Sequence, residues 1–358
     1  MKNNDPIRKS LNENLSAVEV SEYRQRNMIE SIIDSGVKVK PVTSRGLIFA
    51  AMLLVLSITA LGGSVYHARV TPDDMEWGAN NTGKMAMQML NMDGEVINTH
   101  ANEEQLLHDG FKVGLISGFP VERDFTLMFI LNGHIQPYYY NGELCDYSVH
   151  TVDAKGSCDI PVSFGELYLT DEEQQFMYAV AVTDVVNNDG SEWVPSDKWD
   201  APPGFSGALT IDFRPESEPN TEIEYVQDYE LLPDDWGRAS VMWYNKYDTL
   251  NEPDRNSERT RIHTAECFYT SNDGTFEHKY AAGGGKVQIV CLVDNIPYVN
   301  DNGKLTCLDL KYEVMCLQTA NVEGLERGEH KIWMLQVPID SAYIELAFET
   351  PIMFVNVE

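Results

Sequence analysis

The chain has 358 residues and a formal net charge of −30 at pH 7, from 26 Lys and Arg against 56 Asp and Glu. Residues 70–358 hold all but nine of the basic residues and all but six of the acidic ones. Such an anionic surface repels nucleic acid and anionic lipid, which excludes nucleic-acid binding by this region. A hydrophobic content of 43% is enough for packed cores and excludes wholesale disorder.

The first 45 residues are predicted to be a cytoplasmic tail with one short helix. Within residues 19–34 (EVSEYRQRNMIESIID), the side chains of Tyr23, Met28 and Ile32 contribute to a partial apolar face at helical spacing. This face is either a docking site for a cytoplasmic regulator or an amphipathic segment that rests on the membrane. Tyr23, Met28 and Ile32 are therefore the candidate partner-binding residues of the tail.

An uncharged run over residues 46–66 (GLIFAAMLLVLSITALGGSVY) predicts a single transmembrane helix in the lipid bilayer. At ~1.5 Å per residue the run spans about 31 Å, close to the ~30 Å hydrocarbon core of a membrane. The alternatives are a cleaved signal peptide and a buried core helix. Because Lys38, Lys40 and Arg45 precede the run and only Arg69 follows closely, we expect a cytoplasmic N-terminus and an extracytoplasmic C-terminal part.

Residues 67–109 are predicted to form a stalk between the membrane and the first folded domain. The segment MAMQMLNM contains Met85, Met87, Met89 and Met92. A methionine cluster is one way to bind a soft metal ion. We expect these side chains to pack against the first domain instead, because methionine commonly fills gaps in cores.

From residue 111 onward the apolar residues recur with a period of two or in short unbroken runs, which predicts a mainly β fold. The first series of strands is expected at 125–131, 175–182 and 208–213, with turns at Asn132-Gly133, Asn141-Gly142 and Asn188-Asp189-Gly190. The second series is expected at 240–244, 286–293, 306–316, 331–337, 343–349 and 352–357. Many short strands separated by turn signals indicate sandwiches or barrels.

The two series contain a weak internal repeat. Residues 127–143 (LMFILNGHIQPYYYNGE) resemble residues 289–304 (IVCLVDNIPYVNDNGK), each with an apolar strand, a Pro-Tyr step and a closing Asn-Gly. We therefore predict two tandem immunoglobulin-like β-sandwiches, copies of one module, outside the membrane. The expected boundaries are 1–45 for the tail, 46–66 for the membrane helix, 67–109 for the stalk, 110–216 for the first sandwich and 217–358 for the second.

This layout resembles that of single-pass membrane proteins of Gram-positive bacteria that carry extracytoplasmic β-sandwich modules. The residues that carry the resemblance are the helix SEYRQRNMIESIID, the uncharged run and the two PY…NG hairpins. Membrane anti-sigma factors of those bacteria have a similar arrangement. The resemblance implies the topology and the fold, and it adds a signalling role to the alternatives.

All six cysteines follow the predicted membrane helix, on the side where disulfides form. Cys145 and Cys158 stand alone in the first sandwich, so they are the candidate disulfide pair. The four in the second sandwich, Cys267, Cys291, Cys307 and Cys316, are either bridged or free. A direct Cys307–Cys316 bond is not expected, because residues 306–316 are predicted to be one strand whose side chains alternate.

No catalytic, cofactor-binding or metal-binding motif stands out. The eight histidines show no H-x-x-x-H spacing, and the cysteines show no C-x-x-C. The sequence Gly283-Gly284-Gly285-Lys286 lacks the spacing of a phosphate-binding loop and leads into a strand. We therefore predict no enzymatic activity, no cofactor and no metal site.

One loop carries the remaining candidate binding residues. Residues 191–205 (SEWVPSDKWDAPPGF) place Trp193 and Trp199 in a Pro-rich segment. The two indoles either stack on a ligand such as a sugar or cover the end of the sandwich. We predict a non-enzymatic, membrane-anchored binding or sensing protein of the cell envelope. The alternatives are an anti-sigma-like signalling protein and a carbohydrate-binding or adhesion protein.

Overall fold

The computed structural model describes residues 85–184, 191, 205–232, 242–243, 268–299, 303–311, 314–340, 348–350 and 352–358. The chain divides into two compact units, Met1–Val65 and Tyr66–Glu358, and every described residue belongs to the second. The predicted tail helix, with Tyr23, Met28 and Ile32, and the predicted membrane span lie outside the described residues. Within those residues, no helix has the length and apolar character needed to cross a membrane.

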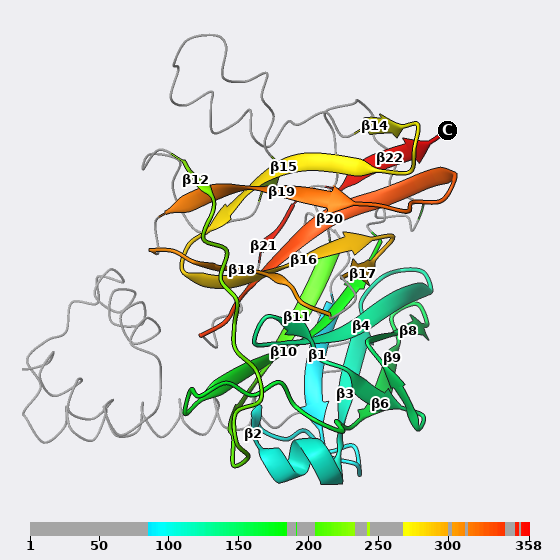
Figure 1. The fold of residues 1–358 in the computed structure, drawn as a ribbon. Helices are drawn as coiled ribbons and strands as arrows, with labels where there is room; N and C mark the ends of the chain where they lie inside the picture. Colours follow the sequence, from blue (N-terminus) through cyan, green and yellow to red (C-terminus); the bar gives the residue numbers. More distant parts are fainter. Residues whose placement is uncertain are drawn as a thin grey trace, which may run out of the picture. The chain divides into compact units, whose positions relative to one another are not determined.

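The described residues from 85 to 214, called here the first half, form two sheets and one hairpin (Figure 1). The outer sheet has the order β1 (Met85–Leu90), β3 (Phe111–Ser117), β9 (Ser157–Val162). The inner sheet has the order β2 (His100–Asn102), β11 (Phe205–Arg214), β10 (Gln175–Thr183), β4 (Arg123–Leu131), β5 (His134–Ile135), with β8 (Tyr147–Val152) also beside β4. The hairpin is β6 (Tyr138–Tyr140) with β7 (Glu143–Cys145), and a short π-helical turn, η2 (Gln105–Asp109), follows β2.

The described residues from 230 to 358, called here the second half, form another outer and inner sheet. The outer sheet has the order β12 (Glu230–Leu231), β19 (Met315–Val322), β15 (Phe276–Gly283), β13 (Met242–Trp243). The inner sheet has the order β14 (Phe268–Ser271), β22 (Met353–Val357), β20 (Gly328–Pro338), β16 (Lys286–Val293), β17 (Ile296–Tyr298). Two further strands flank it: β18 (Thr306–Asp309) lies beside β16, and β21 (Phe348–Glu349) lies beside β20.

The two halves repeat the same strand order. In the outer sheets, the order β1-β3-β9 matches β13-β15-β19. In the inner sheets, β2-β11-β10-β4-β5 matches β14-β22-β20-β16-β17, including the parallel pair at one edge. The register matches too, since Ile130 of β4 faces Tyr178 of β10 while Leu292 of β16 faces Trp333 of β20. Residues of the two halves can therefore be compared position by position.

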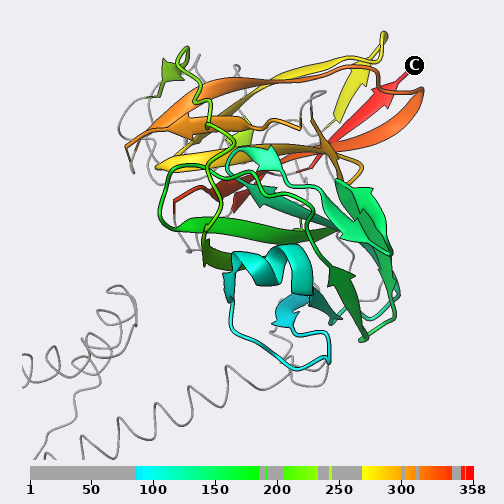
Figure 2. The same ribbon diagram turned by 60° about the horizontal axis from the view of Figure 1, so that its bottom comes forward.

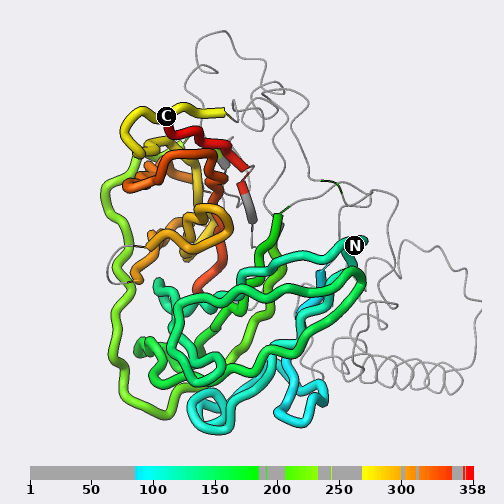
Figure 3. Tube along the Cα trace, turned by 90° about the vertical axis from the view of Figure 1, so that its right-hand side faces the viewer, coloured from blue at the N-terminus to red at the C-terminus, as the bar shows by residue number. Residues whose placement is uncertain are grey.

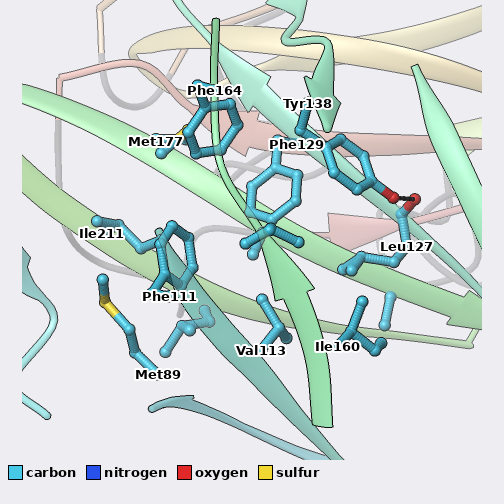
Figure 4. Close-up of a cluster of buried hydrophobic side chains, with 14 of the residues drawn as sticks. Met89, Phe111, Val113, Leu127, Phe129, Tyr138, Ile160, Phe164, Met177 and Ile211 are labelled. Carbon is cyan, nitrogen blue, oxygen red and sulfur yellow. Dashed lines mark hydrogen bonds between the residues drawn. The ribbon is translucent and has the colours of Figure 1, made fainter. Parts of the chain in front are cut away.

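Each half encloses its own core between its outer and inner sheets. In the first half, alternate residues of β4 such as Phe125, Leu127 and Phe129 point into this core. Figure 4 shows Phe129 at its centre, with the Phe164 ring 5.1 Å away at an interplanar angle of 89°. Such edge-to-face packing is the favoured geometry for aromatic pairs.

A third apolar layer joins the two inner sheets. Met128 and Ile130, on the opposite face of β4, pack in one buried cluster with Leu292 and Trp333 of the second half. Figures 2 and 3 show the two halves as adjacent bodies, and the buried cluster contains residues of both inner sheets. Because the inner strands are buried on both faces, their sequences are nearly continuous apolar runs rather than alternating patterns.

Hydrogen bonds at one two-residue turn reinforce this junction. In the β4–β5 turn, Asn132 and Gly133 both have positive φ, at 48° and 80°, which the tight hairpin requires. The Gly133 N–H donates to Gln288 Oε1 of the second half at 2.7 Å, and its carbonyl accepts from the Leu305 N–H at 2.8 Å. A Cβ at Gly133 would lie 2.8 Å from Cys307 Sγ, so the turn touches the second half without spare space.

The described part of the predicted stalk belongs to the first sandwich. Residues 85–90 form β1 of the outer sheet, and residues 100–102 form β2 of the inner sheet. Met89 is buried in the first core, with Met85 and Met87 packed against it. The methionines alternate along a strand with period two, so those facing the core fill it. Residues 85–109 are therefore not a stalk.

Replacing Gly133 with Ala tests the tight turn. We expect the free energy of unfolding to fall by about 2–4 kcal/mol, from the left-handed backbone and from crowding of Cys307. Gly142→Ala is the matched control, because its φ is 82° and a Cβ there meets nothing within 4 Å. Urea denaturation should show a loss of only about 1–2 kcal/mol for the control. Equal losses in the two variants would contradict the crowded contact.

Candidate functional site

An open cleft of about 400 Å³ lies where the first half meets the β16–β17 turn of the second half. Four carboxylates line it: Glu122, Asp124, Asp184 and Asp294. The side chains of Val149, from the first half, and Ile296, from the second, add apolar surface to the lining, with exposed fractions of 52% and 37%. The cleft therefore combines negative charge with a small accessible apolar surface.

The first half supplies one wall because β4 and β10 are antiparallel. The start of β4 and the end of β10 thus lie side by side at the same end of the inner sheet, since Thr126 faces Val182. Thr183 Oγ1 donates to the Asp124 carbonyl at 2.7 Å, which ties the two strand ends together. The Thr151 hydroxyl of β8 donates to Asp124 Oδ1 at 2.6 Å and orients that carboxylate.

Among the described residues that line the cleft, Arg123 is the one arginine, and its side chain is bonded within its own half. Its Nη2 donates to the carbonyl of Asp184, and its guanidinium carbon lies 5.8 Å from the centre of the Phe119 ring. A guanidinium stacked on an aromatic face and bonded to a backbone carbonyl is held in place. The charge facing the cleft is thus set mainly by the carboxylates.

The second half supplies the other wall through the two-residue turn Asp294-Asn295. Both residues have positive φ, at 51° and 65°, as in the turn at Asn132-Gly133. Asn295 Nδ2 donates to Asp184 Oδ1 at 2.9 Å, and Asn295 Oδ1 accepts from Trp333 Nε1 at 3.1 Å. Lys331 Nζ lies 3.3 Å from the same oxygen of Asp184. Asp184 is therefore the point where the two walls meet.

The corresponding turn of the first half leaves less space, and one residue difference explains why. Thr126 faces Val182 and Gln288 faces Val337, so Thr126 and Gln288 occupy equivalent positions of the two inner sheets. The longer Gln288 reaches the facing turn and bonds to Gly133. Thr126 is shorter and lines the cleft instead. The internal repeat at residues 127–143 and 289–304 could have revealed this difference, had it been extended by one residue toward the N-terminus.

A second polar cluster lies under the β6–β7 hairpin. Ser148 Oγ is 2.5 Å from His150 Nε2 and also contacts the Tyr138 hydroxyl, which donates to the Leu127 carbonyl at 3.1 Å. Burial lowers the pKa of His150, so its ring is neutral near pH 7. With the proton on Nε2, each group donates to the next, from His150 through Ser148 and Tyr138 to Leu127. This chain links β6 and β8, and we assign it a structural role.

The cleft lacks the arrangement expected of a metal centre. In the part of the chain that the structure describes, no group of three or more His, Cys, Asp or Glu side chains is placed to hold a metal ion. Trp193 and Trp199, the predicted ligand-binding residues, lie outside the described residues. In the sequence they lie between the end of β10 at Thr183 and the start of β11 at Phe205, and the residue that follows β10, Asp184, lines the cleft.

The predicted Cys145–Cys158 disulfide is absent, because both thiols are free. Cys145 lies on β7 opposite Tyr138, and the adjacent Tyr139 pairs with Ser163. Cys158 is five residues before Ser163, or about 16 Å along an extended chain. A disulfide requires Cα atoms within about 7 Å. Closeness in sequence therefore misled the prediction, because the two residues sit at different heights on β7 and β9, with β6 between these strands.

The prediction of one strand over residues 306–316 is also corrected. Its ends form β18 in the inner sheet and β19 in the outer sheet. Cys316 packs in the second core, whereas Cys307 approaches Gly133 of the first half. Both thiols, and that of Cys291, are free. The fourth cysteine of this half, Cys267, lies outside the described residues.

Comparison with known proteins yields neither a family model nor a curated protein that matches the chain. Among solved structures, the Salmonella enterica SafA pilin in complex with the SafB chaperone covers 74% of this chain and 96% of its own, at 9% identity and a TM-score of 0.25. The E. coli chaperone DraB covers 72% of this chain and 93% of its own, at 9% identity and a TM-score of 0.23. Similarity this low carries no functional argument.

Thiol labelling tests the free state of Cys145 and Cys158. Burial and the charge of Asp159 raise the pKa of the Cys158 thiol to about 11, so its thiolate fraction at pH 7.5 is on the order of 10⁻⁴–10⁻³. We expect slow alkylation of Cys158 in the folded protein and complete alkylation of both thiols after unfolding without reductant, read by peptide mass. Cys145→Ser is the control and should leave Cys158 labelling unchanged. A linked pair of peptides would contradict the structure.

Proposed function

We propose that the chain is a non-enzymatic, membrane-anchored binding protein of the cell envelope, with its two halves acting as tandem immunoglobulin-like sandwiches outside the membrane. The uncharged run at residues 46–66 and its basic N-terminal flank support the anchor and its orientation. The anionic composition of residues 70–358 supports a soluble exported part. The acidic cleft at the junction is the observation that supports binding.

We assign the cleft a ligand that carries a positive charge on an apolar stem, such as a lysine side chain of a peptide. Val149 and Ile296 offer surface to the stem, while Glu122 and Asp124, both exposed, offer carboxylates to the cation. A volume of about 400 Å³ falls within the usual range of ligand sites. Asp184 and Asp294 shape the wall of the site rather than bind the cation, because their carboxylates are already bonded to Asn295 and His330.

Two further proposals concern regions outside the described residues. Trp193 and Trp199 follow the cleft residue Asp184 in the sequence and would serve as a stacking surface for an envelope glycan. Tyr23, Met28 and Ile32 would bind a cytoplasmic regulator, in the manner of an anti-sigma factor, and so report events at the cleft. The lipid bilayer is the partner of residues 46–66.

Neutralising the exposed carboxylates tests the cleft. Titration calorimetry of the full chain in detergent, with a tri-lysine peptide, should detect binding that weakens as salt is added. Glu122→Gln with Asp124→Asn should reduce the affinity by about two- to tenfold, the scale of partly exposed ion pairs. The matched control is Glu172→Gln with Glu173→Gln, an exposed acidic pair outside the cleft lining, which should leave the affinity unchanged.

Two comparison ligands sharpen this test. A tri-lysine peptide with acetylated side chains has lost its charges and should bind far more weakly. Equal binding of the charged and acetylated peptides, or equal weakening by the two pairs of substitutions, would overturn the proposed site. If a neutral envelope oligosaccharide alone binds, and Trp193→Ala with Trp199→Ala removes that binding, the carbohydrate-binding alternative replaces it.

The proposed topology has a separate test. Protease added to intact cells should digest the large C-terminal part and leave a small membrane-protected N-terminal fragment, seen with an N-terminal epitope tag. Leu54→Arg should impair insertion, because arginine at the centre of a membrane helix costs about 2.5–3.5 kcal/mol. Leu54→Ile is the control and should insert normally. Full protection of the C-terminal part would show that the orientation is wrong.

A further inference from the structure

The repeat places a hydrogen-bonded pair of side chains at the same position in each half. Asn132 and Asp294 are the first residues of the two equivalent turns. Gln175 stands three residues before Tyr178, which faces Ile130 of β4. His330 stands three residues before Trp333, which faces the equivalent residue of β16, Leu292. Asn132 Nδ2 donates to Gln175 Oε1 at 2.6 Å, and His330 Nδ1 lies 2.7 Å from Asp294 Oδ2.

The equivalence extends to the next contact of each pair. Gln175 Nε2 donates to the Thr170 carbonyl at 2.8 Å, and His330 Nε2 lies 2.8 Å from the Glu326 carbonyl. Both carbonyls belong to the connection that leads into the strand. The two halves thus share one arrangement, called here the device. In it, a side chain near the start of β10 or β20 bonds both to a side chain of the β4–β5 or β16–β17 turn and to a backbone carbonyl. In the first half its members are amides, which do not titrate, and in the second half they are an acid and a base.

The geometry at His330 indicates the charged form of the ring. Both ring nitrogens face oxygen acceptors, the Asp294 carboxylate and the Glu326 carbonyl. A neutral imidazole has one N–H and cannot donate to both, whereas an imidazolium can. Burial lowers the pKa of His330, but the bonds to Asp294 and Glu326 and the negative charges of both residues outweigh it, so the net pKa is raised.

The Asp294–His330 pair is connected to the cleft through the turn. Asp294 Oδ1 accepts from the Lys331 N–H at 2.8 Å, and the Asp294 N–H donates to the Lys331 carbonyl at 2.8 Å. The next residue, Asn295, crosses to Asp184 of the first half. The position of Asp294 therefore sets both the wall of the cleft and the contact between the halves at this end of the junction.

The surroundings of His330 contain few competing charges. Asp294 approaches it from the β16–β17 turn, and Glu326 from the β19–β20 connection. On its other side, β22 presents Val355 in register with it. Lys331, the next residue of β20, lies against Asp184. The carboxylate of Asp294 is thus the principal group that responds to the charge of His330.

We propose that the Asp294–His330 pair is a pH-controlled clasp on the junction cleft, which holds the β16–β17 turn against the first half when His330 is protonated and loosens it when His330 is neutral. The assignment of a ligand to this cleft rests on the proposed function, but the clasp itself does not. In the first half, Asn132 and Gln175 occupy the same places and do not titrate, and the ring of the nearest histidine, His134, is hydrogen-bonded to the backbone carbonyl of Asn132, at 3.0 Å.

The direction of the effect follows from the raised pKa. The stabilisation is fully present below the ordinary histidine pKa near 6.5 and is lost as the pH rises through the raised value of the folded protein. Above that value one of the two bonds of His330 disappears, and Asp294 keeps its charge without a cationic partner. The clasp is therefore closed in mildly acidic surroundings and open in alkaline ones.

Hydrogen-exchange mass spectrometry of the full chain provides a test that needs no ligand. The protection of peptides covering residues 293–297 and 328–333 is compared at pH 5.5 and 8.5, after correction for the intrinsic rate of exchange. The peptide covering residues 174–178, which contains Gln175 and no histidine, serves as the reference within the same molecule. We expect the protection of the second-half peptides to fall by about three- to tenfold relative to the reference, the scale of one charged hydrogen bond at a partly exposed site.

The matched variant is Asp294→Asn with His330→Gln, which installs the pair found in the first half. We expect it to fold, with an unchanged melting curve at pH 8.5, and to show no relative change of protection with pH. His330→Gln alone keeps the fold testable if the double variant is unstable, and it should also remove the pH dependence. Relative protection that stays constant with pH in the wild type would overturn the clasp. So would a pH dependence in the two variants equal to that of the wild type.

The two proposals fail separately in this design. Loss of tri-lysine binding with intact pH-dependent protection would reject the ligand and leave the clasp standing. Tri-lysine binding with pH-independent protection would reject the clasp and leave the ligand standing. If both hold, wild-type affinity for tri-lysine should change with pH between 5.5 and 8.5, and the affinity of the double variant should not.

Discussion

The apolar layer between the two inner sheets is the contact on which the rest of the structure depends. Met128, Ile130, Leu292 and Trp333 are buried there, although each lies on the face of its sheet that points away from its own core. Burying such side chains stabilises a protein by about 1.5–3 kcal/mol each. Without the partner half, each inner sheet would expose a broad apolar face to water. The two sandwiches are therefore packed together as one folded body and are not independent domains joined by a linker.

The sequence predicted the elements whose signals are local. The nearly continuous apolar runs at 125–131, 175–182 and 286–293 coincide with inner strands β4, β10 and β16, because burial on both faces leaves little polar alternation. The turn at Asn132-Gly133 lies where its residue types predict it. The fold is mainly β and built of packed sheets, as composition and periodicity indicated.

The errors came from features that depend on distant parts of the chain. Residues 85–109 were assigned to a stalk, although the expected packing of their methionines against the first domain is confirmed at Met89. Cys145 and Cys158 looked like partners because they are close in sequence, but the heights of their strands keep them apart. The cleft was missed because its walls come from residues 122–184 and 294–296, which only the stacking of the halves brings together. Comparing the two copies residue by residue would have drawn attention to Thr126, Asp294 and His330.

The repeated halves have a consequence for how such a site can arise. In a symmetric homodimer every substitution occurs twice, so both ends of the interface must accept the same residue. Two copies joined in one chain are free of that restriction. Here one end of the junction keeps Gly133 and Gln288 in close contact, while the other carries Asn295, Thr126 and an open acidic wall. Joining the two copies in one chain thus allows one end of the junction to keep the contact that holds the halves together, while the residues at the other end can change.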